Sequence, residues 1–226
     1  MMDAASASVS KPLPDILPIF PLTGVLLLPR GRLPLNIFEP RYLNMVEDAL
    51  GQGRVIGMIQ PAAAGSEGNS ENPEVYKIGC VGRMISFAET GDGRFLITLA
   101  GVSRFQIASE LPLHRGYRRV RASYDAFAAD RGEESESIAD RERLLAAVRD
   151  FFKVKEIKAE WKAVAEAGDE ALVMTLAKVC PFDPQEKQAL LECNGLRARA
   201  ELLTVVMELA VRGANSESTG SNTRLQ

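Results

Sequence analysis

A proline-punctuated apolar segment near the beginning of the chain constrains its fold more than any other feature. Two apolar runs, residues 17–22 and 25–29, are followed by a third, residues 33–38, which leads into Glu39-Pro40. Proline at the first helical position gives up an amide that has no partner there, and glutamate beside it suits the positive end of the helix dipole. The segment therefore predicts short apolar strands separated by a turn, followed by a helix over about residues 40–50.

Further short apolar runs continue this pattern to about residue 130. They cover residues 54–60, 76–87, 95–99, 101–107 and 117–124. Asp92-Gly93 favours a tight hairpin turn, and Gly79 and Gly82 predict a bulge or a sharp bend. Residues 62–73 are rich in Gly, Ser and Asn and predict a surface loop. Many short strands with a single helix predict a compact, barrel-like sheet.

The second half of the chain has the spacing of helices. Leu144, Val148 and Phe152 recur at helical intervals, and a further helix is expected from about Asp169 to a point before Pro181. Asp183-Pro184-Gln185-Glu186 has the pattern of a capping box and predicts the start of another helix. The last helix is expected over residues 196–211. The sequence thus predicts a flexible tail (1–15), a β-rich part (16–130), a helical bundle (131–212) and a disordered, Ser/Asn/Thr-rich tail (213–226).

Composition argues against several classes of protein. The 226 residues carry a net charge of −3, which gives no overall attraction to nucleic acid or anionic lipid. No apolar run approaches the ~18 residues of a membrane span, and residues 1–11 lack a basic start and an apolar signal core. Cys80, Cys180 and Cys193 form no Cys-x-x-Cys pair, and their odd number argues against a disulfide framework. We expect a cytoplasmic protein with reduced, mostly buried thiols.

Several segments, in the same order along the chain, resemble the substrate-binding (N-terminal) domain family of Lon proteases. They are Ile19-Phe20-Pro21-Leu22, Ile37-Phe38-Glu39-Pro40-Arg41-Tyr42, Ile78-Gly79-Cys80-Val81-Gly82-Arg83-Met84-Ile85, Asp92-Gly93-Arg94, Gly101-Val102-Ser103-Arg104-Phe105 and the stretch from Pro181 to Glu192, with Arg199 and Leu202-Leu203 in the final helix. The resemblance implies an α+β fold, in which a β-rich, PUA-like pseudo-barrel with one helix precedes a C-terminal α-helical bundle. It also implies a role in recognising substrate polypeptides.

The catalytic chemistry of a Lon protease has no counterpart in this sequence. A nucleotide motor needs a glycine-rich loop that ends in Gly-Lys-Ser/Thr, and Gly65-Ser66-Glu67-Gly68 lacks the lysine. The serine–lysine peptidase motif is also missing. His114, the only histidine, is expected to be solvated, and Cys180 and Cys193 are expected to pack in the helical core, without metal-ligand spacing. The sequence therefore predicts no catalytic, cofactor-binding or metal-binding residues, and an ATP-independent protein that is an enzyme in family name only.

Two binding functions follow as alternatives. The first is a non-catalytic adaptor that binds unfolded or partly unfolded polypeptides, or a protein partner, on apolar surface left open within residues 26–38 or in a groove against the helical bundle. The second is an RNA-binding module that uses the strand at 117–121, where Tyr117, Arg119 and Arg121 share one face. The competing interpretation of that strand is an edge strand whose arginines pair with carboxylates. A hydrolase with a cryptic activity is a third, weaker alternative.

Overall fold

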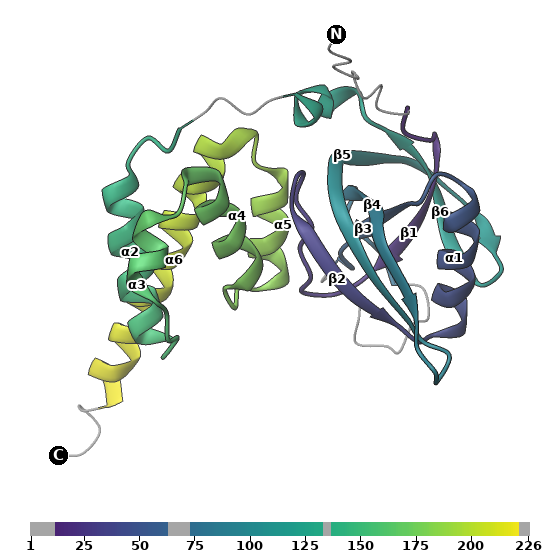
Figure 1. Cartoon of the computed structure of the whole chain (residues 1–226). Coiled ribbons are helices and arrows are strands. Elements are labelled where there is room, and N and C mark those ends of the chain that lie inside the picture. Colours follow the sequence, from purple (N-terminus) through teal and green to yellow (C-terminus); the bar gives the residue numbers. More distant parts are fainter. Residues whose placement is uncertain (1–11, 63–72, 133–136, 222–226) are drawn as a thin grey trace, which may run out of the picture.

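The computed structural model describes residues 12–62, 73–132 and 137–221, and their side chains up to residue 215. Figure 1 shows a β-barrel followed by a bundle of helices, which confirms the predicted α+β fold. The strands are β1 (Ile16–Pro21), β2 (Arg32–Ile37), β3 (Val55–Ile59), β4 (Ile78–Glu89), β5 (Phe95–His114) and β6 (Tyr117–Ser123). The helices are α1 (Pro40–Gly51), the 3-10 helix η1 (Asp125–Arg131), α2 (Arg141–Val154), α3 (Trp161–Glu166), α4 (Asp169–Val179), α5 (Pro184–Glu192) and α6 (Gly195–Ser221). Most of the loop predicted at 62–73 lies outside the described residues.

The barrel closes through the long strand β5. The sheet has the order β2-β5-β4-β3-β1-β6, and β6 pairs a second time, with β5. The first part of β5 pairs with β2, and its last part pairs with β6. Five strands therefore form the ring, and β2 is attached outside it as an additional strand on β5. Closure satisfies the backbone of the other strands on both sides.

The sequence predicted two strands where the structure has the single strand β5. The strands predicted over 95–99 and 101–107 are continuous in β5, which has a bulge where Val81 pairs with Ser103 and Gly82 pairs with Gly101, leaving Val102 as an extra residue. This register shift confirms the bulge predicted near Gly82. A Cβ atom on Gly101 would lie 2.0 Å from the carbonyl oxygen of Leu28, so glycine here permits the close approach of another segment rather than a turn.

Helix α1 packs beside β6, as Figure 1 shows, and confirms the helix predicted from Glu39-Pro40. Its buried residues Tyr42, Met45, Val46 and Ala49 follow the spacing i, i+3, i+4, i+7, which places them on one face toward the barrel. The ring of Tyr42 lies 4.2 Å from that of Phe20 on β1, measured between centroids.

The helical bundle begins and ends its helices mostly where local signals predict. The amide of Asp183 donates to the carboxylate of Glu186 (2.8 Å), so the predicted capping box starts α5. One expectation is wrong: α6 continues past residue 211 to Ser221, through sequence predicted to be disordered. No proline interrupts this stretch, and extending an existing helix costs far less than starting one. Within the described ranges, no helix combines the length and apolar character needed to cross a membrane.

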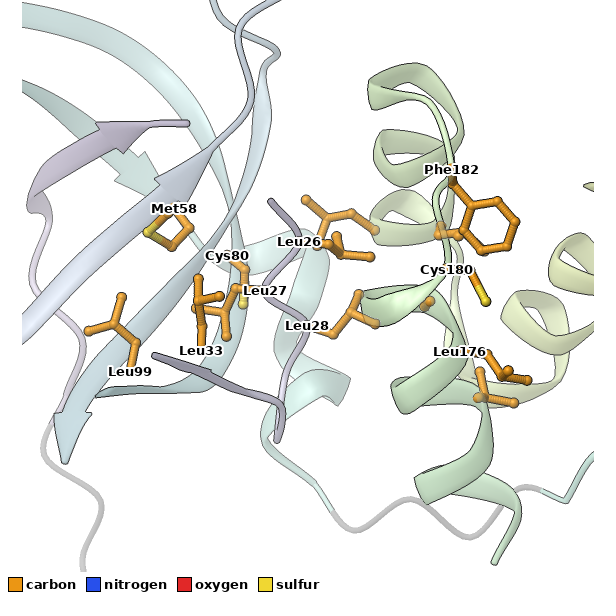
Figure 2. Packing of buried hydrophobic residues seen from close by; sticks show 14 of the residues in the cluster. Leu26, Leu27, Leu28, Leu33, Met58, Cys80, Leu99, Leu176, Cys180 and Phe182 are labelled. Carbon is orange, nitrogen blue, oxygen red and sulfur yellow. The ribbon is translucent and has the colours of Figure 1, made fainter. Parts of the chain in front are cut away.

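A short extended segment, residues 25–29, joins the barrel to the bundle. It was predicted to be a strand, but it forms no strand pairing because its side chains pack in two directions (Figure 2). Leu27 lies against the barrel, whereas Leu26 and Leu28 lie toward the helices. The buried residues around them form one continuous apolar cluster across both parts, including Leu33, Met58, Cys80 and Leu99 of the barrel and Leu176, Cys180 and Phe182 of the bundle. The boundary predicted between residues 130 and 131 stays a prediction.

Polar contacts at both ends of α5 complete this junction. At its beginning, Gln60 donates to the carbonyl of Pro184 (3.0 Å) and Lys187 donates to the carbonyl of Gly24 (2.7 Å). At its end, the buried Arg104 of β5 donates to the carbonyl of Cys193 (2.8 Å). A positive charge is favourable beside the exposed carbonyls at the end of a helix. The junction therefore combines apolar packing with matched polar groups.

Candidate functional site

The apolar segment predicted to leave a surface open is mostly buried. Leu26, Leu27 and Leu28 are enclosed at the junction, and Leu33 and Ile37 are buried in the same apolar cluster. A cavity lies at this junction beside α4, but it is very small, about 10 Å³. The predicted groove between barrel and bundle is therefore filled with the chain's own side chains.

Exposed apolar side chains instead gather on the outside of three neighbouring strands, β2, β5 and β4. Pairing places successive rows of residues across these strands, and alternate residues point outward. We call this surface the outer face. It consists of Arg32, Pro34 and Asn36 of β2, Leu96, Thr98 and Ala100 of β5, and Arg83, Ser86 and Ala88 of β4, together with Phe38 and Arg94 at one end. None of these outward residues is acidic.

Three large apolar side chains on or beside the outer face are exposed, and we call them the apolar patch. Phe38 is 61% exposed, Ile85 49% and Leu96 46%. Ile85 has no partner on β5, because the register shifts between Met84 and Ser86. Such a bulge turns an additional side chain outward. The guanidinium of Arg94 lies 6.0 Å from the centre of the Phe38 ring, so a cation borders the patch.

The other end of the outer face carries two arginines in one row. Arg32 on β2 and Arg83 on β4 both pair with Ala100 of β5, which lies between them. The Nη1 atom of Arg83 donates to the carbonyl of Gly53 (3.0 Å), a neutral partner that leaves its charge uncompensated. In the described part of the chain, neither arginine forms an ion pair with a carboxylate. Arg32 also borders the cavity beside α4, together with Lys178.

Strand β6 does not present the surface that RNA binding would need. Tyr117 is buried, and its hydroxyl donates to Asp48 (2.9 Å). Burial, aided by this hydrogen bond and by the charge of Asp48, raises the pKa of Tyr117 to about 12. The buried Arg118 donates to both carboxylate oxygens of Glu110 (2.7 and 2.8 Å), as the competing interpretation expected. That interpretation is wrong about the edge, because β6 lies between β1 and β5.

The arginines predicted to face RNA differ from one another in the structure. Arg119 is half-buried and donates to the carbonyl of Pro112 (3.4 Å), while Arg121 is exposed. Since the ring of Tyr117 is enclosed, no aromatic face lies open between them for a base to stack on. The structure therefore separates the residues that the sequence placed together on this strand.

The remaining candidate residues have structural surroundings. His114 ends β5, where its ring meets the ring of Tyr117 edge-on with 5.5 Å between centroids. Cys180 is buried, as predicted, and burial raises the pKa of its thiol to about 12, whereas Cys193 is half-buried after α5. In the described ranges, no three His, Cys, Asp or Glu residues lie close enough together to hold a metal ion. Trp161 packs on Phe152 inside the bundle.

Arginines in the family-like segments have three different roles that the sequence alone does not separate. Arg104 is buried in the junction, Arg83 lies on the outer face, and Arg94 borders the apolar patch. Their strand positions predict only which side of a strand they occupy. A second buried arginine, Arg199, donates to the carbonyl of Leu190 (3.0 Å) and was identified only as part of the resemblance.

The chain is an α+β protein in which a closed barrel is joined to a bundle of helices. The chain belongs to the family described as the ATP-dependent protease La (LON) substrate-binding domain, whose sequence model matches residues 16–208. The Lon N-terminal domain protein from Xanthomonas campestris has a similar fold (TM-score 0.57, 23% identity, covering 84% of this chain and 97% of that one). The N-terminal domain of the Mycobacterium avium complex Lon protease is also similar (TM-score 0.52, 14% identity, covering 85% and 98%).

Relatives named Lon protease align with this chain over one part of their length. Lon protease 2 of Sorangium cellulosum is 31% identical over 53% of this chain and 15% of its own length. The Lon protease of Flavobacterium johnsoniae is 27% identical over 84% of this chain and 24% of its own length. The chain thus spans about a quarter or less of these relatives.

Proposed function

We propose that this chain is a non-catalytic, cytoplasmic polypeptide-binding or adaptor module that holds unfolded or partly unfolded polypeptides on the outer face of β2, β5 and β4. The family match supports this proposal, because it covers the substrate-binding region of Lon. The sequence also lacks the phosphate-binding loop and the serine–lysine motif that ATP-driven proteolysis needs. Binding on this face requires no ATP.

The apolar patch carries the proposal. Phe38 directly follows β2, Leu96 lies on β5 and Ile85 on β4, and each is about half exposed or more. Covering the remaining exposed area of one such side chain contributes about 1 kcal/mol, so the patch supplies roughly 3 kcal/mol in total. An interaction of that size gives weak, reversible binding, which suits transient capture of many unfolded chains. Unfolded polypeptides expose the apolar side chains that such a patch can cover.

Titration of the purified chain into a fluorescently labelled, permanently unfolded protein tests the proposal by anisotropy. We expect weak binding that Leu96→Ser weakens about fivefold, since it removes about 1 kcal/mol of contact. Leu113→Ser is the matched control, because Leu113 lies on the same strand and is similarly exposed (52% against 46%). Absence of binding, or equal weakening by both substitutions, contradicts the proposal.

RNA binding at β6 is the less favoured function, because the ring of Tyr117 is buried and its hydroxyl is hydrogen-bonded. Labelled single-stranded RNA belongs in the same titration as a parallel sample. Salt-sensitive binding of RNA that is lost in the Arg119→Ala/Arg121→Ala double variant would return the function to β6.

A further inference from the structure

The distribution of charge on the outer face points to the sequence of the polypeptide that it selects. We propose that the outer face prefers extended apolar segments with a carboxylate about four residues from the apolar anchor, and that the carboxylate binds over Ala100 between Arg32 and Arg83. This inference rests on the proposed function, since it names the substrate class of the same surface.

The geometry of the sheet forms a slot for one carboxylate. Arg32 and Arg83 lie on the strands flanking Ala100, so their backbones are about 10 Å apart. Ala100 adds only a methyl group between them. The guanidinium of Arg83 is bonded to Gly53, which precedes β3 on the other side of β4, so a carboxylate over Ala100 would draw this side chain toward β5. Arginine presents its donors in a planar fork that matches the two oxygens of a carboxylate.

The charges of this row are available to a ligand. Neither Arg32 nor Arg83 forms an ion pair with a carboxylate in the described part of the chain, and Arg83 donates to a neutral carbonyl. The exposed Lys178 of α4 borders the same small cavity as Arg32 and adds positive charge at this end. The opposite end is different, because Arg94 already pairs with Asp92 (3.0 Å). The uncompensated charge is thus confined to one end of the face.

The spacing between slot and patch sets the spacing required in the ligand. Leu96 and Ala100 lie on the same strand and are four residues apart, which corresponds to about 14 Å in an extended chain. A ligand that runs along β5 and is itself extended covers this distance with about four residues. A carboxylate directly beside the anchor would lie over Thr98, whose row carries Pro34 and Ser86 and no cation.

The outer edge of β2 is poorly suited to pair with an additional strand, so the ligand is expected to contact side chains of the outer face instead. Pro34 lies in the middle of β2 and has no amide hydrogen to donate to a neighbouring strand. A chain added at this edge would meet a gap in its hydrogen bonds. Recognition therefore relies on the exposed side chains of the face, which allows their chemistry to select among segments.

Four labelled peptides with one shared apolar core test the inference by anisotropy. One carries two aspartates about four residues from the anchor, one carries them next to the anchor, one has lysines and one has serines in the distant position. We expect the first to bind about three- to tenfold more tightly than the serine peptide, the second to gain little, and the lysine peptide to bind most weakly. Added salt should remove the advantage, because these charges are exposed.

Substitutions test whether the preference for the distant aspartates arises at the two arginines. Arg32→Glu should abolish the preference for the distant aspartates over serines. Arg121→Glu is the matched control, since Arg121 is an exposed strand arginine on β6, outside the outer face. Thermal unfolding verifies that both variants fold.

Equal binding of the aspartate, serine and lysine peptides would overturn the inference and leave the proposed function standing. Failure of all four peptides and of the unfolded protein would instead remove the proposed function. A preference for aspartate that Arg32→Glu does not change would also overturn the assignment to this slot.

Discussion

Replacing Arg104 by methionine should destabilise the protein by about 3 kcal/mol, because it breaks a buried ion pair and leaves the end of α5 without its donor. Arg104 donates to Asp130 through Nε (2.9 Å) and Nη2 (2.8 Å), and its side chain is only 4% exposed. Its Nη1 atom reaches the carbonyls of Glu192 (3.1 Å) and Cys193 (2.8 Å). Its guanidinium also covers the ring of Phe127, 4.6 Å from the centroid.

The magnitude follows from what the substitution leaves behind. Removing one partner of a buried pair costs roughly 3–5 kcal/mol, since the other charge stays buried without compensation. The lower end applies here, because Asp130 still accepts from the backbone amide of residue 104 (2.8 Å). The double variant Arg104→Met/Asp130→Leu should regain part of the loss, because no unpaired carboxylate remains.

Urea unfolding followed by far-ultraviolet circular dichroism and by the fluorescence of Trp161 measures this effect. Trp161 is the only tryptophan and reports on the bundle. Arg143→Met is the matched control, because Arg143 pairs with Glu208 at a similar distance (2.8 Å) but is 54% exposed, so its loss should change stability far less. Equal losses in the two variants would refute the argument that burial at the junction makes Arg104 important.

Three further predictions concern the same framework. Burial alone would raise the pKa of Asp130, but hydrogen bonds from the side chain and backbone of Arg104 lower it overall. The ionised carboxylate therefore stabilises the fold above its unfolded pKa of about 4, and this contribution is lost as the pH falls below that value. In urea titrations across this range, Asp130→Asn should lose less stability on acidification than the unchanged protein. Gly101→Ala should cost more than about 2 kcal/mol in the same assay, because its Cβ would lie 2.0 Å from the oxygen of Leu28, and a neutral result would contradict the close approach. Asp183→Ala should lower stability by about 1 kcal/mol through loss of the cap of α5, measured as a shift in Tm.

Local signals account for the elements that the sequence predicted well. Helix α1 begins at Pro40, which lacks the amide that would have no partner there. Helix α5 begins after Asp183, whose amide donates to the carboxylate of Glu186. Asp92-Gly93 forms the predicted hairpin, with Gly93 at a positive φ of 77°. Each of these features depends on neighbours in the chain.

Contacts between distant residues account for the elements that differ from the sequence-based predictions. Separate strands were predicted over 95–99 and 101–107, whereas β5 is continuous, and the missing side chain of Gly101 makes room for the backbone of Leu28. Residues 25–29 have the apolar composition of a strand, but their two-sided burial between barrel and bundle leaves them without strand partners. Composition alone does not distinguish these cases, because burial and strand pairing favour the same residue types.

The candidate site also combines features set by neighbouring residues with features set by contacts between distant parts of the chain. Sequence alone determined the family resemblance, the absence of the motor and peptidase motifs, the α+β class and the starts of α1 and α5, since these depend on residue identity and short-range hydrogen bonds. Only the tertiary structure decided that Phe38 and Leu96 are exposed on one face, that Arg32 and Arg83 flank Ala100, and that Tyr117 is enclosed. Strand register and barrel closure set those positions, and both are fixed by the packing of residues far apart in the chain.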